Sequence, residues 1–251
     1  MLTGKSKRKK AKKRTNAGGG HRMEKLGEEA CGVAKEVQVL WTEERRTLTL
    51  CSEPVLEYTL SWPRVEGAGL GGRWISGYYA RLAQSWRRRW EREVYWLACL
   101  ELAARREGAR PFTPWTGELA GETALLRDGV LSLRFWGAEV RGDGRPARVR
   151  WGDVWNVREG APKPLGSLFA GEKGWRKGLW QALVRQGEAR RQAGDCFLDG
   201  DWSQKAKKAR PLRSWCLTEE GVEVSLPQCA ASPAAEGCPV FILPLEKYGN
   251  Q

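Results

Sequence analysis

Apolar and polar residues alternate along several stretches of the chain, and this alternation predicts β-strands. A polar turn is expected at residues 42–46, and Pro63 is expected to end the strand that precedes it. Asp128-Gly129 lies between two apolar alternations, which is typical of a β-hairpin, and Asp143-Gly144 repeats the pattern. The expected strands span residues 37–41, 47–51, 55–62, 118–126, 130–140, 149–154, 212–217, 222–226 and 240–243.

Apolar residues at steps of three and four predict a long helix from Ile75 to Leu100, after a glycine-rich loop at 67–72. Its stripe consists of Ile75, Tyr78, Tyr79, Leu82, Trp86, Trp90, Val94, Leu97 and Leu100. A second helix is expected over 172–192 and a short one over 203–209. The order of elements predicts an α+β fold, in which an antiparallel sheet packs against one long and one shorter helix. We expect the closing strands to share a sheet and the Trp86 and Leu97 stripe to pack against it.

The formal net charge of +13 depends largely on the N-terminus. Residues 1–22 hold nine Lys or Arg and no acid, and the remaining chain has a net charge of +4. Such a run predicts a disordered basic tail at 1–30, followed by a single domain at 31–251. Gly18-Gly19-Gly20 just before Met23 also fits a translated leader with the true start at Met23. Nucleic acid is therefore expected as a partner only through the 1–22 tail.

Few side chains suit catalysis or metal binding. The sole histidine, His21, lies in the tail, which argues against Ser-His-Asp, Cys-His and His-based metal sites in the folded part. Seven cysteines without CxxC spacing favour neither a disulfide framework nor a zinc site, although a turn could join Cys229 and Cys238. We predict no catalytic residue, metal or cofactor. The sequence has no membrane-spanning apolar stretch or secretory signal, so as written the chain is expected in the cytoplasm.

The last quarter of the chain contains a loop that two prolines and a glycine should hold rigid between strands. The candidate ligand-binding residues in this loop are Pro233, Ala234, Ala235, Glu236 and Gly237. They follow the stretch LTEEGVEV at 217–224 and lie within SPAAEGCPVFILP at 232–244. Pro233 and Gly237 could also do no more than shape the crossing between two strands.

These two stretches resemble the end of a bacterial domain of unknown function found in RsiV-type anti-sigma factors and in PdaC-type polysaccharide deacetylases. The segment from Gly160 to Phe169 and the Trp-bearing helix after it are similar as well. The resemblance implies an α+β binding domain, because RsiV-type members bind lysozyme, and members are often extracytoplasmic. This chain departs from the pattern at Arg141-Gly142-Asp143-Gly144, where many members have Gly-Gly-x-His, and at Ala234, where an aromatic residue is common.

The first hypothesis is a non-catalytic recognition domain for a protein or a cell-wall-derived ligand, which would use the 233–237 loop. The second is a nucleic-acid-associated protein that acts through its basic tail. The third is a hydrolase that uses carboxylates alone, whose partners need not be close in sequence.

Overall fold

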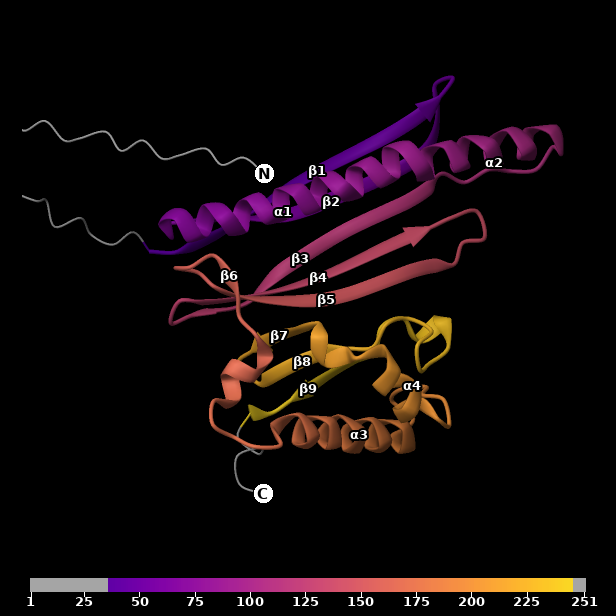
Figure 1. The fold of residues 1–251 in the computed structure, drawn as a ribbon. Helices are drawn as coiled ribbons and strands as arrows, with labels where there is room; N and C mark the ends of the chain where they lie inside the picture. Colours follow the sequence, from indigo (N-terminus) through magenta and orange to yellow (C-terminus); the bar gives the residue numbers. More distant parts are fainter. Residues whose placement is uncertain (1–35, 246–251) are drawn as a thin grey trace, which may run out of the picture. The chain divides into compact units, whose positions relative to one another are not determined.

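The computed structural model describes residues 36–245 (Figure 1). The predicted disordered tail at 1–30 lies outside the described residues. The strands are β1 (Gln38–Leu50), β2 (Glu53–Glu66), β3 (Trp115–Arg127), β4 (Val130–Val140), β5 (Pro146–Asn156), β6 (Ala161–Pro162), β7 (Trp215–Thr218), β8 (Gly221–Ser225) and β9 (Val240–Leu243). The α-helices are α1 (Gly69–Arg89), α2 (Tyr95–Glu107), α3 (Trp175–Ala193) and α4 (Trp202–Ala209). A π-helical turn, η1 (Trp90–Val94), joins α1 to α2, and the 3-10 turns are η2 (Leu165–Phe169), η3 (Pro211–Arg213) and η4 (Ala234–Glu236).

Two sheets are present in the described part of the chain. Strands β1 to β6 form one in sequence order, and β7 to β9 form the other. All neighbours pair antiparallel except β2 and β3, which are parallel because the long helix connects them. The predicted hairpin at Asp128-Gly129 is confirmed: both residues have positive φ, 53° and 75°, as a two-residue turn of this type requires. The α+β architecture with a long and a shorter helix is confirmed as well.

The first two strands are longer than predicted. The expected turn at 42–46 is wrong, since β1 runs through it unbroken and Glu44 there pairs with Arg87 of α1. The expected stop at Pro63 is also wrong, because β2 continues to Glu66. Beyond Leu60 the pairing of β2 with β3 ends, and β2 pairs only with β1. A proline is tolerated there because one edge of the strand needs no N–H donor.

The helices α1 and α2 and the turn η1 form one continuous rod along the first sheet (Figure 1). Its buried residues follow steps of four on either side of the π-helical turn: Ile75, Tyr79 and Ala83, then Trp90, Val94, Ala98 and Leu102. The wider π turn shifts the buried face. The predicted stripe is therefore wrong at Leu97 and Leu100, which follow the turn and are exposed; it is also wrong at Tyr78, which is exposed on α1 before the turn. None of the helices within residues 36–245 is both long enough and apolar enough to cross a membrane.

The long helix packs on the first sheet and not on the sheet of the closing strands, so this part of the prediction is wrong. Its apolar face meets residues of β2 to β5, including Leu56, Leu119 and Phe135. The closing strands do share one sheet, as predicted, and α3 and α4 cover it through Leu179 and Trp202. Each sheet thus has a helical layer of its own, because both sheets present an apolar face that must be buried.

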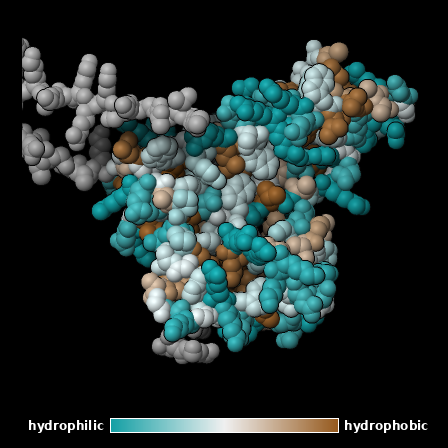
Figure 2. All heavy atoms as spheres, viewed as in Figure 1, coloured by the Kyte–Doolittle hydropathy of each residue, from teal (hydrophilic) through white to brown (hydrophobic). Residues whose placement is uncertain are grey.

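The two sheets meet over β4 and along the outer edge of β5. Gly152 N donates to Ser214 Oγ at 3.2 Å, and Arg148 N donates to Gln228 Oε1 at 2.6 Å. In return, Ser225 Oγ donates to Arg150 O at 3.1 Å. Side chains of the second layer therefore satisfy backbone groups that an edge strand would otherwise leave unpaired. On the face seen in Figure 2, hydrophilic side chains cover most of the surface, with smaller apolar areas between the long helix and the second layer.

Candidate binding groove

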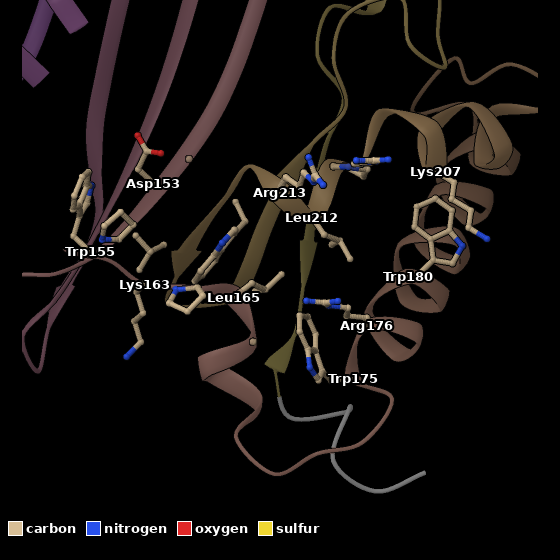
Figure 3. A pocket seen from close by; sticks show the side chains of 18 of the residues that line it. Asp153, Trp155, Lys163, Leu165, Trp175, Arg176, Trp180, Lys207, Leu212 and Arg213 are labelled. Carbon is tan, nitrogen blue, oxygen red and sulfur yellow. The ribbon is translucent and has the colours of Figure 1, made fainter. Parts of the chain in front are cut away.

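A cavity of about 860 Å³ opens where the second layer meets β5. Its walls come from β5, from the segment between β6 and η2, and from the start of α3, the end of α4 and η3 (Figure 3). Five aromatic side chains line it: Tyr78, Trp155, Trp175, Trp180 and Trp215. We call this cavity the tryptophan groove. Its volume is that of a small-molecule or oligomer site, and its aromatic lining suits flat apolar faces of a ligand.

Three of the five aromatic rings of the groove are held by contacts with other rings. Trp175 lies parallel to Phe169, with ring centroids 5.0 Å apart and an interplanar angle of 8°. Tyr78 meets Trp155 edge-on at 5.3 Å. Trp155 is anchored further, because its Nε1 donates to Tyr79 Oη at 2.8 Å. These rings therefore have little freedom to rearrange, and a rigid aromatic surface loses little entropy on binding.

Five basic side chains line the same groove: Lys163, Arg176, Lys207, Arg210 and Arg213. The Arg176 guanidinium lies 5.0 Å from the centre of the Trp175 ring, so a cation and an aromatic face are presented together. None of the five forms an ion pair with an acid among residues 36–245. Unpaired basic groups around an aromatic surface favour a ligand with negative charge.

Asp153 is the one carboxylate among the described residues that line the groove. Its Oδ2 accepts hydrogen bonds from Tyr79 Oη at 2.9 Å and from Trp151 Nε1 at 3.3 Å. Burial raises the pKa of the Asp153 carboxyl above its ordinary value, although both hydrogen bonds act in the opposite direction. Its second oxygen, Oδ1, accepts no hydrogen bond from the described chain and could accept one from a ligand.

Comparison with known proteins identifies solved structures that have a similar fold. No protein-family model matches the sequence, and no curated protein matches it. Several solved structures do match the chain, and two of them share 13% sequence identity with it. One is a DUF3298 family member from Bacteroides fragilis NCTC 9343, with a TM-score of 0.58 over 84% of this chain and 90% of that chain. The other is a DUF3298 family protein from Pseudomonas aeruginosa PAO1, with a TM-score of 0.54 over 83% and 90%.

This chain shares the fold of the DUF3298 proteins. The expected resemblance to a bacterial domain of unknown function is thus supported at the level of the fold. In both comparisons about nine-tenths of the DUF3298 chain is covered, so the shared fold includes both sheets and not one layer alone.

The predicted binding loop lies elsewhere on this DUF3298 fold. Pro233, Ala234 and Ala235 are exposed, Glu236 is half-buried and Gly237 is buried. Among the described residues that line the tryptophan groove, none comes from this loop. The structure therefore groups the five predicted residues together but separates them from the groove.

Internal contacts account for much of the loop's conformation. Glu236 Oε2 accepts a hydrogen bond from Phe197 N at 3.3 Å, and Ala234 O accepts one from Gln228 Nε2 at 2.9 Å. Gly237 has a φ of 71°, which favours glycine. Gln228 lines a different hollow, of about 660 Å³, near the turn between β4 and β5.

No group of three or more His, Cys, Asp or Glu side chains within residues 36–245 could hold a metal ion. The sequence left open whether Cys229 and Cys238 form a disulfide bond, and both are free thiols.

Sequence reasoning missed every residue of the groove. One signal was present: a tryptophan lies beside a basic residue at Trp175-Arg176, and Arg213 lies two positions before Trp215.

Proposed function

We propose that this protein is a non-catalytic recognition domain that binds a protein or a cell-wall-derived ligand through the tryptophan groove. The observation that carries the proposal is the combination of a rigid aromatic lining with five basic side chains that have no acidic partner in the described chain. Such a surface attracts an anionic ligand and packs against its flat faces. The resemblance to the RsiV-type and PdaC-type domains also supports a binding role.

A binding role also fits the chemistry of the groove better than hydrolysis does. A glycosidase uses two carboxyl groups on either side of the bond to be broken, at separations of roughly 5 to 9.5 Å. Among the described residues of the groove Asp153 stands alone. The two most buried carboxylates elsewhere, Glu139 and Glu223, each pair with two arginines, which suits a structural role.

The test compares soluble peptidoglycan fragments binding to the intact protein and to a variant with Arg176→Gln and Arg213→Gln, by isothermal titration calorimetry. We expect the variant to bind at least about tenfold more weakly, since each lost charge-assisted contact contributes about 1.5 to 3 kcal/mol. The matched control is Arg88→Gln with Arg92→Gln. These two arginines are exposed, lie on the long rod and form no ion pair within the described chain.

Equal weakening in the control would mean that only the overall charge matters, and the groove would lose its role. A third variant, Pro233→Ala with Glu236→Ala, tests the predicted loop in the same assay. If only this variant lost binding, the recognition surface would be the loop and not the groove. The thermal stability of this third variant has to be measured in parallel, because Glu236 also accepts a hydrogen bond from Phe197 N.

A further inference from the structure

The aromatic surface does not end at the edges of the tryptophan groove. On α1, Leu70, Trp74 and Tyr78 follow one another at steps of four residues and are 71%, 65% and 41% exposed. Residues four apart lie on the same side of a helix, about 6 Å apart along its axis. Tyr78 already lines the groove, so Trp74 and then the aliphatic Leu70 continue an apolar ridge along α1 outward by two helical turns.

A second contact ties Trp74 to the groove. A Cβ atom placed on Gly160 would lie 3.0 Å from the Cβ of Trp74. Gly160 directly precedes β6, which leads through Pro162 and Lys163 into the groove wall. The Cβ of Trp74 therefore lies beside the segment that leads into the groove wall.

The opposite end of the groove is extended as well. Trp180 lines both the groove and a neighbouring hollow of about 400 Å³ on α3, whose other walls are Gln181, Val184 and Arg185. Figure 3 shows Trp180 on α3, across the groove from Trp155 on β5. The groove therefore opens at Trp180 into a neighbouring hollow, which adds Arg185 to the basic side chains nearby.

We propose that the ligand of this groove is an extended anionic glycan, which runs along an aromatic track from Trp74 through the tryptophan groove to Trp180. This inference rests on the proposed function and adds the class and length of the ligand. A chain that leaves the groove toward α1 would contact Trp74, an aromatic platform that a single disaccharide in the groove cannot reach. The unpaired basic side chains between the platforms would face its carboxylates.

A glycan fits better than single-stranded nucleic acid, which also uses aromatic and basic grooves. Asp153 lines the groove with one oxygen, Oδ1, that no described group satisfies. A carboxylate oxygen accepts hydrogen bonds from the hydroxyl groups that a glycan carries along its whole length. An anionic glycan would place its flat sugar faces against the aromatic rings of the groove and its carboxylates, spaced along the chain, against the basic side chains.

The test uses two probes from peptide-free peptidoglycan, the N-acetylglucosamine–N-acetylmuramic acid disaccharide and a long-strand fraction, both titrated calorimetrically against the whole protein. Trp74→Ala should weaken binding of the long strands about five- to tenfold and leave the disaccharide unchanged, because only a long chain reaches this ring. Trp96→Ala is the matched control, as Trp96 is 60% exposed on α2 and does not line the groove.

The outcomes separate the two proposals. If the Arg176 and Arg213 variant weakens both probes but Trp74→Ala weakens neither, the groove stands and the extended track is overturned. If Trp74→Ala and Trp96→Ala weaken the long strands equally, the track is also overturned. If no glycan binds but oligo(dT) does, with affinity that falls steeply with salt, the ligand is nucleic acid and the glycan proposal is wrong. Absence of binding by every probe overturns the glycan proposal and leaves a protein as the ligand of the groove under the proposed function.

Discussion

Ser132 makes a hydrogen bond whose loss should weaken the junction of the two layers. It lies on β4, is 0% exposed, and its Oγ accepts a hydrogen bond from Leu217 N of β7 at 2.7 Å. Ser132→Ala keeps the shape of the site almost unchanged and removes only this acceptor. Leu217 N would then be a buried donor without a partner, which costs about 1 to 3 kcal/mol. For a chain of this size the melting temperature should fall by about 2 to 12 °C.

Urea unfolding followed by far-UV circular dichroism and by tryptophan fluorescence measures this cost. The control is Ser85→Ala, because Ser85 is exposed and bonds only to Leu82 O in its own helix, so its change should stay within about 0.5 kcal/mol. Coincident transitions with both probes would indicate that the layers unfold as one unit. The reasoning is refuted if Ser132→Ala costs no more than the control, or if only one of two separate transitions shifts.

Three further changes have defined outcomes. Asp153→Asn should raise the melting temperature at neutral pH. The pKa of the buried carboxyl is raised, so its contribution to stability is complete below a pH of about 3.9 and declines as the pH rises through the folded pKa. A pH series of melting curves should therefore show that the higher melting temperature of the variant disappears in acid. Gly187→Ala should destabilise by about 1 to 3 kcal/mol, since its Cβ would lie 2.3 Å from the indole ring of α4, whereas Gly200→Ala, with open space, should not. Burial raises the pKa of Cys216 to about 12, so iodoacetamide at pH 8 should alkylate the exposed Cys51 and Cys229 before Cys216, as peptide mass spectrometry would show.

Elements whose signals are local in sequence were predictable. Asp128-Gly129 specifies its turn through two positive φ angles, and the short helix α4 matches its expected range to one residue. Errors arose where a distant partner decides the structure. Glu44 and its neighbours have the composition of a turn, yet they extend as a strand because each pairs with a residue of β2, and Glu44 also pairs with Arg87 of the long helix. Propensity cannot reveal such a partner in advance.

The packing of the long helix was mispredicted for a related reason. A pattern with steps of three and four cannot distinguish an α-helix from one that contains a π turn, and the turn at Trp90–Val94 decides whether Leu97 or Ala98 is buried. The choice of sheet was also beyond the sequence. Both sheets offer apolar residues, and the connection from β2 through the helix to β3 places it on the first one.

The tryptophans show why the candidate site in particular could not be read from the sequence. Fourteen tryptophans are scattered along the chain, and a set of binding platforms would be expected to be local. Trp90 and Trp202, both 0% exposed, do serve as core residues. The groove, however, gathers Trp155 from β5, Trp175 and Trp180 from α3 and Trp215 from β7, over a span of sixty residues. Proximity in space arises because β5 borders the second layer, so a platform can be local in the fold while its residues are distant in the chain.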